Sequence, residues 1–248
     1  MSTSASIVRP PKTRVDGAAR IAGQIGAAIV AGRYRPDALV PGEIELGRRY
    51  GASRTVVREA LKLLSAKGLI SSRKRAGTRA MPRDSWNMLD ADVLAWRLKH
   101  KRAEPKFVAD LLAVRAIVEP AAAALAAQHR TAKALKAIER AFADMERTAH
   151  AAALFVDPDR RFHKAILVAT GNDFMVAFAA LTETALGTFV QIASRHPGAP
   201  LPSVPLHRAV LDAIRARDAA KAGRAMTVLL DRTARNVERN VKRRRRPG

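Results

Sequence analysis

The segment from Leu46 to Thr78 constrains the fold of this chain more than any other. It reads LGRRYGASRTVVREALKLLSAKGLISSRKRAGT, in which a Gly-Ala turn joins two helix-forming stretches and a basic stretch follows them. Ser53 is a favourable N-cap, so the second helix is expected to begin at Arg54. Gly68 can end that helix, and residues 69–78 can then form two short strands around a tight basic turn. This order of elements predicts a winged helix-turn-helix, a motif that reads double-stranded DNA.

The helix predicted to begin at Arg54 has a buried face and an exposed face. Its apolar residues recur at spacings of three and four, which places them on one side: Val57, Ala60, Leu61 and Leu64. Arg54, Thr55 and Arg58 then face outward, and an arginine fork matches the acceptors of a guanine edge or a phosphate. We expect DNA contacts from this helix, the preceding helix and the wing: Arg48, Ser53, Arg54, Thr55, Val56, Arg58, Arg75, Gly77 and Thr78.

Short motifs along residues 15–80 resemble the GntR family of bacterial transcription regulators. They are Leu-x-Pro-x-Glu at 39–43, Ser-Arg-Thr-x-x-Arg-Glu-Ala-Leu at 53–61, Gly-Leu-Ile at 68–70 and Gly-Thr at 77–78. Two positions depart from the family pattern: Gly42 replaces a small hydroxyl residue or alanine, and Ile44 stands where several members have a DNA-contacting arginine. The resemblance therefore implies a DNA-binding regulator whose operator half-site differs from the half-sites of those members.

Composition limits which other functions are possible. The formal net charge is +23, and residues 1–80 hold 16 lysines and arginines against 5 acidic residues. The excess of positive charge extends to the basic run at 242–246, which either adds contacts with DNA phosphates or is only a solvated tail. There is no cysteine, which excludes a disulfide framework and a thiolate metal site. No signal-peptide core or membrane-length apolar run is found, so we expect a bacterial cytoplasmic protein without membrane partners.

The chain beyond the DNA reader is predicted to be entirely helical, because no alternating strand pattern occurs there. A short helix is expected at 92–98, and Pro105 opens a long one. Further helices are expected at 132–153, 158–169, 172–195, 202–216 and 218–241. The fold class is thus mainly α, with an N-terminal winged helix-turn-helix and a C-terminal antiparallel all-α helical bundle.

Two pairs of polar residues could form a site inside the bundle. Asp159 and His163 lie four apart on one predicted helix, so they share a face that can hold a divalent metal or a polyol. His207 begins another helix that could face them. A local Asp-His hydrogen bond is the alternative interpretation of this spacing, and an internal salt bridge is the alternative for Arg115 and Glu119.

The same residues resemble the FCD ligand-binding domain of the FadR subfamily. The matching motifs are Arg-x-x-x-Glu at 115–119, Asp-x-x-Phe-His at 159–163, Gly-Asn at 171–172, and His207 followed by Ala-Ile at 213–214 and Asp218. The resemblance implies a central cavity, lined by Arg115, in which one aspartate and three histidines bind a divalent metal. Asp159, His163 and His207 match three of these ligands, but Leu229 occupies the position of the fourth.

This departure leaves two forms of the site open. The three remaining ligands could hold zinc or nickel, with water and effector in the open positions. Alternatively, the cavity is metal-free and these residues bind the effector directly, which the missing ligand slightly favours. The segment from Pro82 to Trp96 also resembles the galactonate-repressor branch of the subfamily, whose members sense sugar acids. That resemblance implies a small hydroxylated carboxylate such as an aldonate, bound by Arg115, Asp159, His163 and His207. Ser203, shortly before His207, is expected to supply a further hydroxyl contact.

The expected function is that of a homodimeric repressor that leaves its operator when the effector binds. The expected segments are a flexible arm at 1–14, the DNA-binding domain at 15–81, a linker with a helix at 82–103, the effector-binding and dimerisation bundle at 104–240 and a basic tail at 241–248. A metal-dependent hydrolase is the first alternative, but no general base or nucleophile accompanies the Asp-His residues. A general nucleoid-binding protein is the second, although it would not need a ligand-binding bundle. We therefore expect a regulator and no enzymatic activity.

Overall fold

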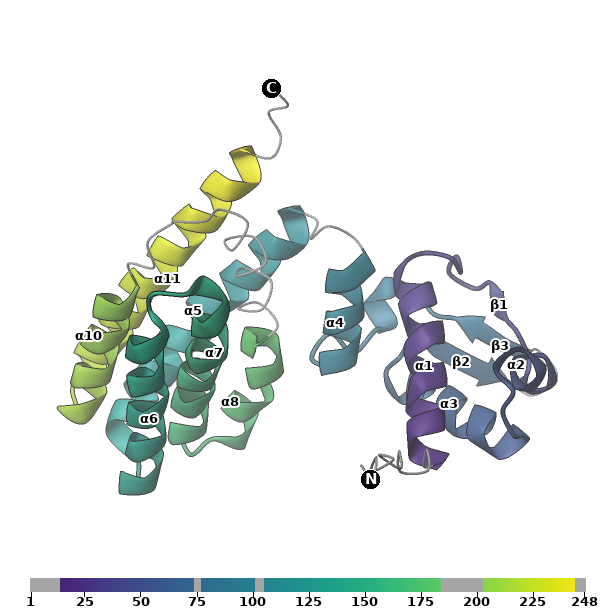
Figure 1. The fold of residues 1–248 in the computed structure, drawn as a ribbon, viewed down its shortest axis with the longest axis horizontal. Coiled ribbons are helices and arrows are strands. Elements are labelled where there is room, and N and C mark those ends of the chain that lie inside the picture. Colours follow the sequence, from purple (N-terminus) through teal and green to yellow (C-terminus); the bar gives the residue numbers. More distant parts are fainter. Residues whose placement is uncertain (1–13, 74–76, 101–104, 184–202, 244–248) are drawn as a thin grey trace, which may run out of the picture. The chain divides into compact units, whose positions relative to one another are not determined.

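The computed structural model describes residues 14–73, 77–100, 105–183 and 203–243. The chain forms two compact units, Met1–His100 and Lys101–Gly248, and the small sheet belongs to the first (Figure 1). Among the described residues, every element of the second unit is a helix. The predicted fold class, mainly α with an N-terminal winged helix-turn-helix and a helical bundle, is therefore confirmed.

The first unit combines a helix-turn-helix with a three-stranded antiparallel sheet. Its elements are α1 (Arg14–Val30), β1 (Leu39–Val40), α2 (Glu43–Tyr50), α3 (Arg54–Ala66), β2 (Ile70–Arg73) and β3 (Gly77–Ala80). The strand order is β1-β3-β2, and the hairpin of β2 and β3 forms the wing. The isoleucines of α1 recur four apart and pack with the apolar face of α3 in one core. This core fixes the angle at which α3 is presented.

A linker helix packs against this unit. After a short 3-10 turn at Arg83–Ser85, α4 (Ala91–His100) lies against α1. Trp96 of α4 lies so close to α1 that a Cβ atom at Gly26 would be 2.3 Å from its ring. Trp86 donates a hydrogen bond from its ring nitrogen to the backbone oxygen of Met81 at 3.0 Å. Both tryptophans therefore anchor the linker to the first unit.

The second unit contains α5 (Pro105–His129), α6 (Ala132–Thr148), α7 (Ala152–Ala169), α8 (Asp173–Ala177), α10 (Val204–Arg215) and α11 (Ala219–Arg243). Its helices bury one continuous apolar core. None of the helices in the described ranges is long and apolar enough to cross a membrane.

Several predicted helix boundaries in this unit were wrong. The helix predicted at 132–153 ends at Thr148, and the next begins at Ala152 rather than at 158. Pro158 lies inside α7, because burial of Phe155 in the core favours an earlier helix start than the proline alone suggests. The helix predicted at 172–195 is interrupted by a turn at Phe178, and its part from residue 184 onward lies outside the described residues.

Gly68 is expected to be intolerant of substitution. Its φ is +72°, and a Cβ atom there would lie 2.0 Å from the backbone oxygen of Ser85. Gly32 has a φ of +76° but no atom within 4 Å of such a Cβ, so Gly32→Ala reports conformational strain alone. We expect a loss of about 1 kcal/mol for Gly32→Ala and of at least about 3 kcal/mol for Gly68→Ala. Denaturant unfolding followed by tryptophan fluorescence tests this, and equal losses would contradict the close approach.

Candidate functional site: recognition helix and buried Asp-His cluster

The exposed face of α3 carries residues predicted to contact DNA. The Ser53 hydroxyl accepts a hydrogen bond from the backbone N–H of Val56 at 3.4 Å, and α3 begins at Arg54 as predicted. Arg54, Thr55 and Arg58 are exposed, whereas the four apolar residues predicted for the inner face are buried. The geometry of α3 is therefore that of a helix able to enter a major groove.

Glu43, the first residue of α2, holds the two exposed arginines of α3. Its Oε2 accepts a hydrogen bond from Arg54 Nε at 3.2 Å, and its Oε1 lies 3.5 Å from Arg58 Nε. Each guanidinium is thus held through its Nε, which leaves the terminal nitrogens available to acceptors on DNA. In the sequence, Glu43 stood out only as the last residue of the Leu-x-Pro-x-Glu motif, because this contact joins residues from two different helices.

We expect Glu43→Gln to reduce discrimination between operator and non-operator DNA by about two- to fivefold, since the pairs are exposed. Binding to non-operator DNA should strengthen slightly, because a negative charge near the phosphates is removed. Glu45→Gln is the matched control, since Glu45 is exposed on the same helical turn and its replacement by glutamine removes the same charge. Gel-shift titrations with both DNAs measure the ratio of operator affinity to non-operator affinity. An equal ratio in the Glu43→Gln and Glu45→Gln variants would count against a role for Glu43.

The remaining predicted DNA-contacting residues differ in accessibility. Arg48 is exposed on α2. Val56 is half-buried and packs against the core of the first unit, so less of it is open to DNA. Gly77 has a φ of +78° at the start of β3, and the Thr78 hydroxyl lies 2.9 Å from the hydroxyl of Ser72 on β2. Arg75 lies outside the described residues.

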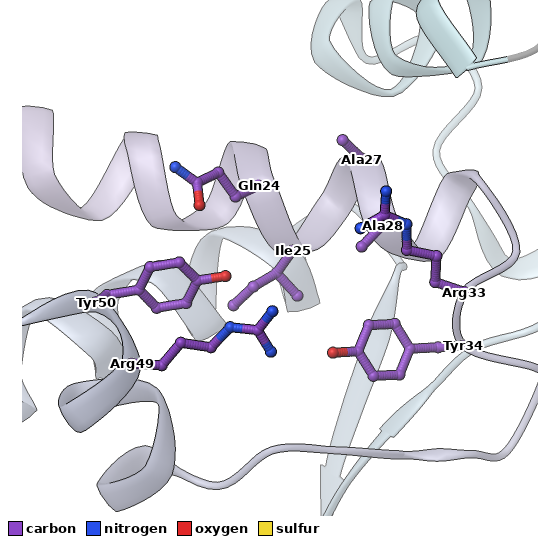
Figure 2. A pocket seen from close by; sticks show the side chains of 8 residues that line it. All are labelled: Gln24, Ile25, Ala27, Ala28, Arg33, Tyr34, Arg49 and Tyr50. Carbon is purple, nitrogen blue, oxygen red and sulfur yellow. The ribbon is translucent and has the colours of Figure 1, made fainter.

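A basic pocket in the first unit was missed by sequence reasoning. It lies between α1 and α2 and is lined by Gln24, Ile25, Ala27, Ala28, Arg33, Tyr34, Arg49 and Tyr50 (Figure 2). In the part of the chain that the structure describes, neither Arg33 nor Arg49 pairs with a carboxylate. The pocket therefore adds to the positive field of this unit. Its residues come from three separated segments, so no local pattern predicts it.

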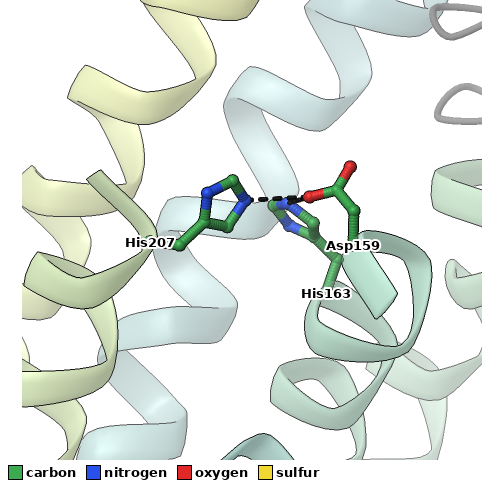
Figure 3. Close-up of side chains that lie close together, drawn as sticks. All are labelled: Asp159, His163 and His207. Carbon is green, nitrogen blue, oxygen red and sulfur yellow. Dashed lines mark ion pairs between the residues drawn. The ribbon is translucent and has the colours of Figure 1, made fainter. Parts of the chain in front are cut away.

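In the second unit, Asp159 and His163 of α7 meet His207 of α10 (Figure 3). All three side chains are buried. The Oδ1 atom of Asp159 lies 2.9 Å from Nε2 of His207 and 3.6 Å from Nε2 of His163. One potential ligand atom from each residue lies within 4.8 Å of the others. The predicted convergence of these three residues is therefore present.

Glu119 of α5 extends this cluster beyond His163. Its Oε2 lies 2.7 Å from Nδ1 of His163, and its Oε1 accepts hydrogen bonds from Arg115 at 2.5 Å and from Thr182 at 3.2 Å. Arg115 and Glu119 thus form the internal salt bridge that was the alternative interpretation of their spacing. Thr182 had no signal in the sequence, because it lies more than 60 residues from Glu119 along the chain.

Burial and charge oppose each other in this cluster. Burial raises the pKa of Glu119, but the charges of Arg115 and His163 outweigh it and lower the pKa to about 2. Burial also raises the pKa of Asp159, yet the two histidines beside it outweigh burial and hold that pKa well below its usual range. For His163, burial lowers the pKa, but Glu119 and Asp159 together raise it to about 9. The cluster therefore favours a positive charge between its two carboxylates, carried by a proton or by a metal ion.

His207 is oriented by the backbone that precedes α10. Its Nδ1 lies 2.7 Å from the carbonyl oxygen of Ser203, and since a carbonyl only accepts, Nδ1 carries the proton. In the neutral ring, the lone pair of Nε2 is then directed toward the cluster. The Nε2 atom and Asp159 Oδ1 are buried without hydrogen-bond geometry between them, despite their short separation. Ser203 thus orients His207 through its carbonyl, and a contact between the Ser203 hydroxyl and the effector stays a prediction.

The donor set fits a divalent metal with open positions. Asp159, His163 and His207 are of the residue types that bind zinc and nickel, and the second ring nitrogen of each histidine faces an oxygen, as is typical of metal-ligating imidazoles. Leu229 is 1% exposed within the apolar core of the bundle and supplies no ligand. The buried Asp-His group could therefore hold a metal through three protein ligands.

Two family descriptions match the chain. "Bacterial regulatory proteins, gntR family" matches residues 18–79, and the FCD domain matches residues 110–232. The first match covers the helix-turn-helix and wing, and the second covers every residue of the Asp-His cluster. The two matched regions thus correspond to the two sites described above.

Two curated relatives come from Escherichia coli strain K12. The HTH-type transcriptional regulator YieP is 35% identical over 219 residues, which cover 85% of this chain and 90% of the relative. The galactonate operon transcriptional repressor is 31% identical over 220 residues, which cover 88% of this chain and 96% of the relative. Among solved structures, E. coli McbR/YncC has a TM-score of 0.54 at 14% identity and covers 91% of this chain and 98% of its own. That structural likeness supports the fold alone.

Proposed function

The chain belongs to the GntR family of bacterial transcription regulators and carries an FCD domain, and we propose that it is a repressor released from its operator by a small hydroxylated carboxylate. The matching families and relatives are regulators and not enzymes. The helix-turn-helix implies binding to double-stranded DNA, and the FCD domain implies a small-molecule effector. The convergence of Asp159, His163 and His207 inside the bundle is the observation that carries the effector proposal.

The charge balance of the cluster supports an anionic effector when a metal is present. Without a metal, Arg115 and protonated His163 balance Asp159 and Glu119, so an added carboxylate would have no counter-charge. With a divalent ion held by Asp159, His163 and His207, the histidines are neutral and the cluster carries one net positive charge. A bound metal would supply a Lewis-acidic point for carboxylate and hydroxyl oxygens. This balance favours the metal-bound form over the metal-free form that the missing fourth ligand suggested.

The similarity to the galactonate operon repressor supports sugar acids as the class of effector. The proposal is tested by titrating the purified protein with galactonate and other aldonates in a calorimeter, with metal analysis of the same sample. Binding of an aldonate that also releases operator DNA supports it. Binding of aldonates without any effect on DNA affinity would contradict the regulatory link.

Dimerisation through the bundle is part of this proposal, because two reading heads can bind two half-sites of a palindrome. The full chain is expected to sediment as a species of twice its 26.9 kDa mass at micromolar concentration. A monomer that binds the operator with full affinity would contradict this arrangement.

Specific regulation must also be separated from general binding driven by the +23 charge. Competition between operator and unrelated DNA at fixed salt makes this distinction. Specific binding is expected to be at least about 1000-fold tighter than binding to unrelated DNA. Equal competition by both DNAs would instead favour a nucleoid-binding protein.

A further inference from the structure

Lys67 lies where the recognition helix meets the linker. It is the C-cap residue of α3, and its side chain is largely buried although it is charged. Its ammonium donates to both carboxylate oxygens of Asp90, at 2.9 and 2.7 Å, and lies 2.9 Å from an oxygen of Asp92. Burial alone would lower the pKa of Lys67, but the hydrogen bonds to Asp90 and Asp92 outweigh it and raise the pKa. The side chain is therefore held firmly by two acidic residues of the linker.

The same carboxylate that binds Lys67 also starts the linker helix. Asp90 Oδ1 accepts hydrogen bonds from the backbone N–H groups of Asp92 at 3.0 Å and Val93 at 3.1 Å, which is the geometry of an N-cap. One turn further along α4, the ring of Trp96 lies 5.8 Å from the Lys67 ammonium. Lys67 thus contacts the first turn and a half of α4 through a single side chain.

Two backbone contacts tie the same point of α3 to the linker. The carbonyl oxygen of Lys67 accepts a hydrogen bond from the N–H of Asn87 at 3.0 Å. The next residue, Gly68, lies so close to Ser85 that even a methyl group would not fit. A displacement of the start of α4 must therefore displace the C-terminal end of α3 or break several contacts at once.

We propose that Lys67 is a positioning residue that couples the linker helix α4 to the recognition helix α3, and so transmits the regulatory signal between bundle and DNA. This inference rests on the proposed function and assigns its transmission to one side chain. The N-terminal residues of α3, which face outward, are on the same rigid helix as Lys67. Movement of α4 would therefore tilt Arg54 and Arg58 with respect to the groove.

The linker contains a native probe of this coupling. The chain has two tryptophans, Trp86 and Trp96, and both lie in the linker. Thermodynamic coupling is reciprocal, so operator binding at α3 should change the environment of α4 without any effector. We expect operator DNA to change the tryptophan emission of the full-length protein and Lys67→Met to remove most of that change. Operator affinity should stay within about threefold of wild type, because Lys67 is not on the exposed face of α3.

Two further variants separate coupling from structural damage. Lys67→Arg keeps the charge and should restore the emission change, while Lys62→Met removes an exposed lysine of the same helix and should leave it intact. The inference is overturned if Lys67→Met keeps the full change in tryptophan emission on operator binding, or if Lys62→Met loses that change equally. It is also overturned if the emission of the wild-type protein does not change when DNA is bound. Absence of operator binding by the wild type in a gel shift would instead contradict the proposed function.

Discussion

Arg54→Ala and Arg58→Ala are each expected to weaken operator binding by about 10- to 100-fold, since a good bidentate base contact contributes about 1–3 kcal/mol. Both side chains are exposed at the start of α3, and Glu43 holds each through its Nε. The double variant should bind operator no better than unrelated DNA. The operator is first selected from random DNA with the wild-type protein, and affinities are then measured by gel shift at fixed salt.

The control for this prediction is Lys62→Ala, which removes one positive charge from the exposed surface of the same helix. It is expected to weaken binding to operator DNA and to unrelated DNA by the same factor, because any loss of affinity is electrostatic and independent of sequence. Effector binding should be unchanged in all of these variants. If the double variant kept wild-type operator affinity, the assignment of α3 as the recognition helix would be contradicted.

The first unit could be predicted closely because its signals are local. Ser53 caps the helix that begins beside it, Gly68 ends that helix with a positive φ, and the buried apolar residues recur at helical spacing. Contacts between elements had no such signal. Glu43 reaches two arginines of another helix, and Lys67 reaches Asp90 across 23 residues. Only folding brings these residues together.

The bundle was predicted less accurately for a related reason. Its alanine-rich helices have few capping residues, so the break near Thr148 and the start at Ala152 were set by packing and not by sequence signals. The Asp159-His163 spacing was visible, but nothing placed Glu119 against the second nitrogen of His163. Because Glu119 orients that ring and fixes its charge, the chemistry of the cluster could be predicted only in part.

Asp159→Asn is expected to abolish the response to effector while leaving operator affinity unchanged. Asp159 is the carboxylate that both histidines approach, and asparagine keeps its shape but removes its charge. Loss of a ligand should weaken metal retention by at least about 100-fold, more than is typical for outer-shell partners. Metal content after dialysis, aldonate binding by calorimetry and aldonate-dependent release of operator DNA measure the three effects separately.

Asp157→Asn supplies the control, because Asp157 is exposed on the same helix and pairs with Arg161 on the surface. It should behave as wild type in all three measurements. A wild-type protein that holds no metal, together with loss of aldonate binding in Asp159→Asn, would show that the cluster binds the effector directly. Full aldonate response in Asp159→Asn would exclude the cluster as the effector site, because asparagine cannot replace the negative charge that lies between the two histidines.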